Sequence, residues 1–240
     1  MKKSKLTDYQ RCLFSIFLKS LVIAFVIAGV TLTYFHGYSG GEHTFLYFTC
    51  QSNLWIGIFD LICLVVLAFN MYKKQYFLSK PYYYLGQVLT VSIALTGIVY
   101  TFILAPGAYL APSDLIANFN PFNVGSIFVH MVVPTLAVID YFLITRNIKF
   151  KGVDGLWSLI PVGGYFIFAI IGYCLNLDFG RGNNFPYFFL NFASPAGIFG
   201  FSSEMPYFMG SFYWIILGFC IVFGLSYCFI GISNKINKRQ

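Results

Sequence analysis

The chain has 240 residues, of which 58% are hydrophobic and only 10% are charged, and its mean hydropathy is +0.74. Soluble globular domains carry about 25% charged residues, so this composition excludes an ordinary soluble enzyme and indicates a membrane protein. The net charge of +7 does not indicate nucleic acid as a partner, because the basic residues lie in short clusters between apolar runs.

Six apolar runs fill nearly the whole chain, and each is long enough to cross a bilayer as a helix. We therefore expect an all-α, polytopic membrane protein whose residues 1–240 form a single transmembrane domain. The predicted helices cover approximately residues 12–35, 45–71, 82–104, 124–144, 156–175 and 207–232.

The positions of the basic residues predict the orientation of these helices. Every Lys and Arg except Arg181 lies at the N-terminus, after the second or fourth run, or at the C-terminus. Cytoplasmic loops of membrane proteins are enriched in Lys and Arg. The sequence thus predicts a multi-pass protein of the cytoplasmic membrane with both termini in the cytoplasm.

The connection between the last two runs contains an apolar, aromatic stretch at residues 185–201. It is interrupted by Pro186, Pro195, Gly197 and Gly200, and it is too short for a seventh span. Irregular backbone is tolerated at membrane depth where it borders a cavity, so we interpret this stretch as a re-entrant segment or a lid.

Polar side chains lie along one stripe of the second predicted helix. At 3.6 residues per turn, Thr49, Ser52, Asn53 and Asp60 share one face, which must meet protein or water because hydrocarbon offers no hydrogen-bond partners. The sequence therefore predicts that another helix packs against this stripe.

The fourth predicted helix has polar residues at matching depths. Counted from the outer helix ends, Thr49 lies about 6 Å deep and His130 about 9 Å deep, and Asp60 and Asp140 match at a deeper level. Pro134 cannot bond the carbonyl of His130, so the helix is loosened at the imidazole. We expect an outer Thr/His level and an inner carboxylate level.

A Thr/His pair supports nucleophilic chemistry. Imidazole can take the proton of a hydroxyl and so activate it for attack on an ester. This reasoning assigns Thr49 as nucleophile and His130 as base, with Ser52 and Asn53 as supporting residues that stabilise an oxyanion. The predicted activity is hydrolysis of a lipid or fatty-acyl ester near the outer face, with membrane lipids as partners and no cofactor or metal.

Two other functions are compatible with the same residues. Asp60 and Asp140 could form an ion or proton site in a transporter or sensor, or they could tie helices together through a polar network. A metal-dependent enzyme would use the histidines and acid toward the outer side, but the chain has no HExxH motif. Those residues are His36, Glu42, His43 and His130.

The outer segment before the sixth helix offers candidate substrate-binding residues. Arg181 and Asn184 could bind an anionic headgroup or carboxylate, and Tyr187 lies beside them in the sequence. Arg181 could equally form an ion pair with Asp178. The sequence leaves these alternatives open.

Three motifs carry a resemblance to known proteins: Phe48-Thr-Cys-Gln-Ser-Asn53, His130 with Pro134 and Asp140, and Phe185-Pro-Tyr-Phe-Phe-Leu-Asn191. With them the chain resembles a family of bacterial six-helix membrane proteins, and it is more distantly similar to the androgen-induced and androgen-dependent membrane proteins. Those eukaryotic proteins are threonine hydrolases of fatty acid esters of hydroxy fatty acids. The resemblance implies that Thr49 is the nucleophile and His130 the base.

Overall fold

The structure is a computed structural model that describes residues 7–110, 122–145 and 148–238. Within these ranges the chain is helical apart from its connections, and it contains no β-strand beyond an isolated bridge between Phe201 and Met209. Six helices are long and apolar enough to cross a membrane, which confirms the expected polytopic class. They are Asp8–His36, Phe48–Tyr72, Lys80–Gly107, Val124–Ile144, Gly152–Cys174 and Ser211–Asn237.

Two of these spans contain a π-helical turn. The third span joins α3 and α4 through a π-helical turn, and the fourth joins α5 and α6 in the same way. In chain order the elements are α1 (Asp8–His36), η1 (Gly41–Leu46), α2 (Phe48–Tyr72), α3 (Lys80–Val99), η2 (Tyr100–Leu104), α4 (Ala105–Leu110), α5 (Val124–Ile127), η3 (Phe128–Val132), α6 (Val133–Ile144), η4 (Gly152–Ser158), α7 (Leu159–Cys174), η5 (Phe188–Leu190) and α8 (Ser211–Lys238).

The helix ends differ from the expected ones where local turns intervene. Before α2, residues Gly41–Leu46 form a 3-10 turn, so α2 starts at Phe48 rather than at residue 45. Residues 207–210 are not helical, and α8 starts at Ser211. α1 starts earlier than expected, because Thr7 and Gln10 form a reciprocal capping box at its N-terminus.

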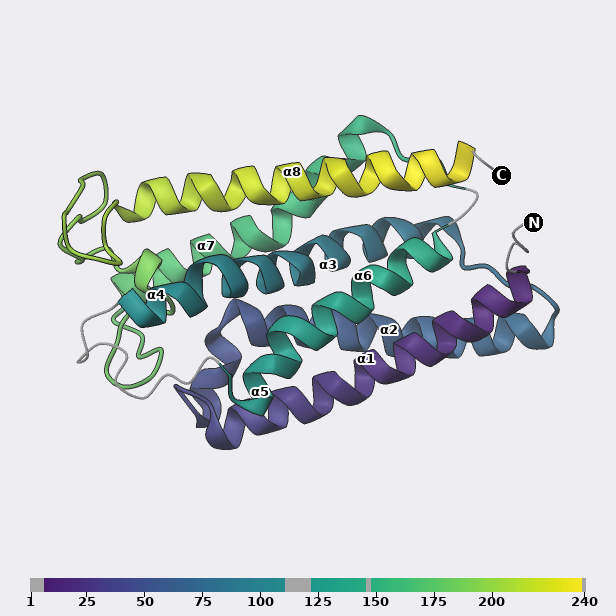
Figure 1. Cartoon of the computed structure of the whole chain (residues 1–240), viewed down its shortest axis with the longest axis horizontal. Coiled ribbons are helices and arrows are strands. Elements are labelled where there is room, and N and C mark those ends of the chain that lie inside the picture. Colours follow the sequence, from purple (N-terminus) through teal and green to yellow (C-terminus); the bar gives the residue numbers. More distant parts are fainter. Residues whose placement is uncertain (1–6, 111–121, 146–147, 239–240) are drawn as a thin grey trace.

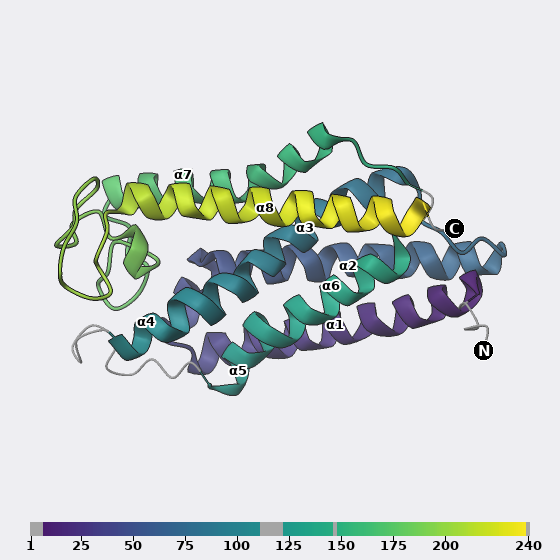
Figure 2. The same ribbon diagram turned by 45° about the horizontal axis from the view of Figure 1, so that its top comes forward.

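α3 lies in the middle of the bundle and packs against α2, α6 and α8 (Figure 1). On one side of α3 lie α1, α2 and α6, of which α1 packs against both α2 and α6. On the other side of α3, α7 and α8 pack against each other (Figure 2). Each side has its own buried apolar cluster. One centres on α1, α2 and α6, and the other on α3, α7 and α8.

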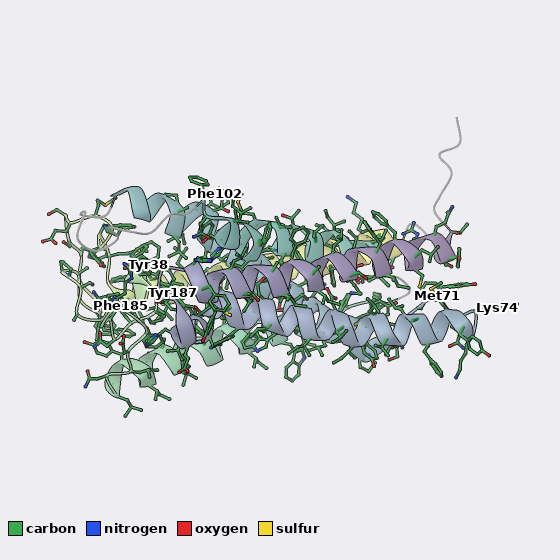
Figure 3. The ribbon with its side chains drawn as sticks, turned by 90° about the horizontal axis from the view of Figure 1, so that it is seen from below. Tyr38, Met71, Lys74, Phe102, Phe185 and Tyr187 are labelled. Carbon is green, nitrogen blue, oxygen red and sulfur yellow. The ribbon has the colours of Figure 1, made fainter. Side chains whose placement is uncertain are left out.

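The two ends of the bundle differ in their connections. The start of α1, the end of α8 and the loops after α2 and α6 lie at one end, whereas η1, α4 and the long connection from α7 to α8 lie at the other (Figure 1). Figure 3 shows Met71 and Lys74 at the first end and Tyr38, Phe185 and Tyr187 at the second. Residues 185–201, which we interpret from the sequence as a re-entrant segment or a lid, belong to the α7–α8 connection at this second end.

Candidate functional site

Thr49 and His130 meet at the end of the bundle that carries the long α7–α8 connection. The Oγ1 atom of Thr49, in the first turn of α2, lies 3.2 Å from Nε2 of His130, which belongs to the π-turn η3. Both residues are half-buried. The structure therefore brings together the two residues that the sequence assigned as nucleophile and base.

A backbone contact defines which imidazole nitrogen carries the proton. Nδ1 of His130 lies 2.9 Å from the carbonyl oxygen of Ser126, and a carbonyl can only accept a hydrogen bond. Nδ1 is therefore the donor, and in the neutral ring Nε2 keeps its lone pair toward the Thr49 hydroxyl. This tautomer is the one that a general base requires.

Two prolines explain why the site lies on π-turns. Tyr100–Leu104 ends two residues before Pro106, and Phe128–Val132 ends two residues before Pro134. A proline has no N–H for the carbonyl four residues earlier, so the helix widens by one residue there. The loosening expected at His130 is thus present as a π-turn.

The two π-turns pack directly against each other. The rings of Tyr100 and His130 stack with centroids 3.7 Å apart and an angle of 16° between their planes. Beside them Gly97 lets the helices approach closely, because a Cβ atom there would lie 3.0 Å from the His130 carbonyl oxygen and 3.2 Å from Cβ of Pro134. The imidazole is therefore held on one face by an aromatic ring and at one nitrogen by the backbone.

Ser52 and Asn53 bond to groups of the surrounding helices, and neither lines the larger cavity beside Thr49. Ser52 donates to the Thr49 carbonyl at 3.1 Å and lies 2.8 Å from the hydroxyl of Thr96. Asn53 donates from Nδ2 to the carbonyls of Thr49 at 2.8 Å and Val129 at 2.9 Å. These contacts occupy the donors expected for an oxyanion, and those of Asn53 tie α2 to the residue before His130.

Tyr187 contacts Thr49 through its hydroxyl, which the sequence did not predict. Its hydroxyl accepts from the Thr49 N–H at 3.3 Å and lies 3.4 Å from Thr49 Oγ1. Burial raises the pKa of Tyr187, so the hydroxyl stays protonated at neutral pH and keeps a proton to donate. The Thr49 N–H also belongs to the first turn of α2, where N–H groups lack intrahelical partners and the helix dipole favours negative charge.

An apolar cavity of about 180 Å³ opens beside Thr49 and His130. Side chains of α1, η1, α2, both π-turns and the α7–α8 connection line it, including Val30, Leu104, Phe185 and Phe188. Near its wall, burial raises the pKa of Tyr47 to about 12, so that this hydroxyl is also neutral. The cavity is suited to an uncharged, largely hydrocarbon ligand.

A second cavity of about 60 Å³ adjoins the first. It is bordered mainly by α3, α7 and α8, and by aromatic side chains such as Phe166 and Trp214. Thr49, Leu104 and Tyr187 line both cavities. The candidate nucleophile therefore lies where the two cavities meet.

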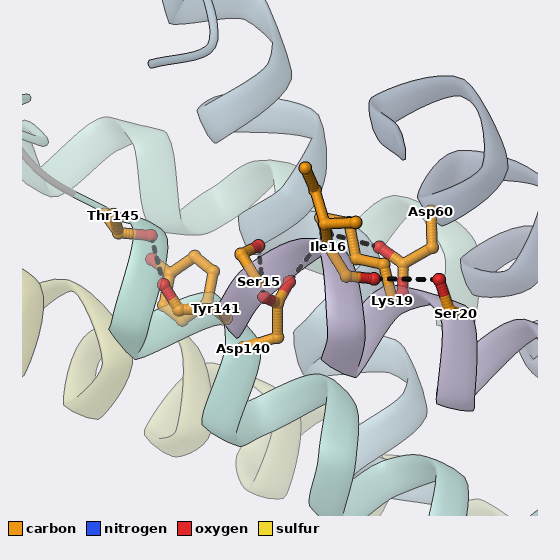
Figure 4. A network of polar contacts seen from close by, with 8 residues as sticks. All are labelled: Ser15, Ile16, Lys19, Ser20, Asp60, Asp140, Tyr141 and Thr145. Atoms are coloured by element: carbon orange, nitrogen blue, oxygen red, sulfur yellow. Dashed lines mark hydrogen bonds and ion pairs between the residues drawn. The ribbon is translucent and has the colours of Figure 1, made fainter. Parts of the chain in front are cut away.

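The inner carboxylates belong to a separate polar cluster with Lys19 (Figure 4). Lys19 Nζ lies 2.6 Å from Oδ1 of Asp60 and 2.6 Å from Oδ2 of Asp140, and Ser15 donates to Oδ1 of Asp140. A lysine near the start of a membrane helix ordinarily extends its side chain to the membrane surface, but Lys19 is 2% exposed and turned inward. Of the roles expected for the two acids, the structure shows the helix-tying network.

Of the three residues assigned to substrate binding, Arg181 and Asn184 do not line the larger cavity, whereas Tyr187 does. Arg181 donates from Nε to the carbonyl of Tyr38 at 2.8 Å and packs on the Tyr38 ring, rather than on Asp178. Asp178 lies 3.8 Å from His43. Asn183 lines the larger cavity, whereas Asn184, next to it, does not. Of the three assigned residues, Tyr187 alone contacts Thr49.

Within residues 7–110, 122–145 and 148–238, no three His, Cys, Asp or Glu side chains are close enough to share a metal ion. His43 contacts Asp178 and His130 contacts Thr49, so the histidines do not converge with Glu42. Comparison of the chain with protein-family models, curated proteins and solved structures gave no match.

Proposed function

We propose that this protein is an intramembrane hydrolase of lipid or fatty-acyl esters, with Thr49 as nucleophile and His130 as general base. The observation that supports this best is the Thr49 Oγ1 to His130 Nε2 contact of 3.2 Å, made by the tautomer that leaves Nε2 free to accept a proton. The apolar cavity beside the pair and the resemblance of the three sequence motifs to membrane threonine hydrolases also support it.

The reaction follows from these positions. Thr49 Oγ1 attacks the acyl carbon while its proton moves to Nε2 of His130, and the Thr49 N–H and the Tyr187 hydroxyl stabilise the oxyanion. The imidazolium then gives its proton to the departing alkoxide. Water, activated by the same imidazole, hydrolyses the acyl-threonine and releases the fatty acid.

The charge distribution supports a site on the outer side of the membrane. Loops rich in Lys lie at the end of the bundle opposite to Tyr187 (Figure 3). By the positive-inside rule that end faces the cytoplasm, together with both termini. A site at the other end would reach lipid esters near the headgroup region and receive water.

The experiment is labelling of the purified protein with a fluorophosphonate probe, followed by mass spectrometry of the modified peptide. We expect an adduct on Thr49 in the wild type. Thr49→Ala should abolish it, and His130→Gln should slow labelling by about 10²-fold or more, because general-base catalysis contributes at least that factor.

A matched control is Thr44→Val. Thr44 lines the same cavity, but its hydroxyl donates to the carbonyl of Thr33 and, in the structure as described, does not contact the imidazole of His130. Its labelling rate should equal that of the wild type. An unlabelled Thr49 in folded wild-type protein, or labelling that persists in His130→Gln, would contradict the proposal.

A further inference from the structure

The Lys19 cluster has more negative than positive groups. One ammonium lies between two carboxylates, so the fully ionised cluster carries a charge of −1. Lys19, Asp60 and Asp140 are each no more than 3% exposed. An unbalanced charge is costly inside a protein that is itself surrounded by hydrocarbon.

Among the residues that the structure describes, no neighbouring group of the cluster provides the missing positive charge. The cluster borders a small cavity of about 20 Å³ between α1, α2, α3 and α6, and among the described residues that line it no other side chain is charged. Its other titratable neighbours are Tyr82 and Tyr83 from α3, Tyr141 from α6 and the thiol of Cys63 from α2. None of these side chains can supply a positive charge, because a phenol or a thiol is neutral when protonated and negative when it is not.

The two carboxylates differ in their hydrogen bonds. Both oxygens of Asp140 have donors, from Ser15 and Lys19. In Asp60, Oδ1 accepts from Lys19, but the buried Oδ2 has no partner. A buried carboxylate oxygen without a hydrogen-bond donor is poorly stabilised when it is ionised. Asp60 should therefore take up a proton more readily than Asp140.

We propose that Lys19, Asp60 and Asp140 form a binding site for a single proton, which is held on Oδ2 of Asp60 at neutral pH. The cluster is then neutral, with Lys19 and Asp140 as the ion pair and Asp60 as an uncharged acid. The adjoining cavity has room for one water molecule that would accept the hydrogen bond of this acid. This inference is independent of the reaction proposed for Thr49.

The test is infrared spectroscopy of the full-length protein at neutral pH, in water and in heavy water. A protonated carboxyl gives a carbonyl stretching band that shifts on deuteration. We expect this band in the wild type and its loss in both Asp60→Asn and Asp140→Asn, because either substitution leaves one carboxylate to pair with Lys19. Asp178→Asn, at an exposed position, should leave the band unchanged.

The absence of the band from the wild type, or its survival in either buried variant, would overturn the proposal. Stability gives a second readout that does not depend on the band. If the folded state binds one proton more than the unfolded state, the free energy of unfolding decreases as pH rises through neutrality. Asp60→Asn, which is neutral at every pH, should have a smaller decrease than the wild type, and an unchanged slope would also overturn the proposal.

Discussion

The hydrogen bond from His130 Nδ1 to the Ser126 carbonyl leaves Nε2 of the imidazole free to accept a hydrogen bond from the Thr49 hydroxyl. The bond is made within one helix turn, so it is available whatever occupies the cavity. The precise approach of the Thr49 hydroxyl, in contrast, depends on contacts between helices. Asn53 makes the contact that sets it, since this side chain joins the carbonyl of Thr49 to that of Val129.

Asn53→Ala should therefore reduce both stability and reactivity. It removes one hydrogen bond from each of the two carbonyls, which lowers the free energy of unfolding by about 0.5–1.5 kcal/mol per bond. It should also slow fluorophosphonate labelling of Thr49, because α2 and η3 lose their connection. Asn70→Ala is the control, since Asn70 bonds the carbonyl of Phe77 at the opposite end of α2. Equal labelling rates in the two variants would contradict this role for Asn53.

Tyr187 should act as a hydrogen-bond donor and never as a base. Because burial raises its pKa above the ordinary value, the hydroxyl is protonated throughout the neutral range and begins to lose its proton only in strongly alkaline solution. Tyr187→Phe should lower the rate of labelling while leaving its pH profile near neutrality unchanged. A profile that shifts in this variant would show that Tyr187 itself titrates during the reaction.

At the scale of elements, the π-turn before Pro134 sets the direction of the imidazole. Pro134→Ala restores an N–H that can bond the His130 carbonyl and so favours an ordinary α-helical turn. We expect His130 to rotate away from Thr49 and labelling to slow. Pro161→Ala, in the first turn of α7, is the control and should label normally. Normal labelling in Pro134→Ala would mean that the turn is not needed for the site.

Lys19 joins three helices, because its own helix α1 meets α2 through Asp60 and α6 through Asp140. Lys19→Met removes the only cation from this buried cluster, as the structure describes it, and should cost about 3–5 kcal/mol in stability. Lys73→Met is the control, since Lys73 is exposed and packs on the ring of Phe69. Thermal unfolding in detergent would measure both. A loss no larger than that of the control would contradict the helix-tying role.

For the whole molecule, the orientation in the membrane can be tested with reporter cysteines at exposed sites. A membrane-impermeant thiol reagent applied to intact cells should label Asp178→Cys, at the end of the bundle that carries the site. It should label Lys74→Cys only after the membrane is permeabilised. The reverse pattern would place the site on the cytoplasmic side.

The sequence predicted the features that depend on composition along the chain. Six apolar runs were sufficient for the six spans, and counting residues from the helix ends placed Thr49 and His130 at the same depth. The start of α2 at Phe48 was missed because Phe45, Leu46 and Tyr47 extend the apolar run, although Phe45 and Leu46 belong to the 3-10 turn Gly41–Leu46. Such boundaries depend on local hydrogen bonds that hydropathy does not record.

Features that depend on side-chain direction were harder to predict. Lys19 lies near a helix start, where a lysine ordinarily extends to the surface, and only the packing of α1 against α2 and α6 turns it toward two acids. Ser52 and Asn53 were another case. They share a helical face with Thr49, as periodicity predicted, but their side chains donate to carbonyls and do not reach the cavity. Periodicity gives the face of a residue but not its partner.

Thr49 lies between two cavities. The helices that hold Thr49 beside His130 are therefore different from the helices that form most of the wall of the smaller cavity. Thr49 and His130 both belong to the part of the bundle formed by α1, α2 and α5–α6, whereas the smaller cavity is closed from the far side by α7 and α8. A shift of α7 and α8 against α3 would change the size of that cavity and leave the distance between hydroxyl and imidazole the same. For the proposed hydrolase, substitutions in the last two spans would therefore change the length of hydrocarbon that fits, without moving Thr49 relative to His130.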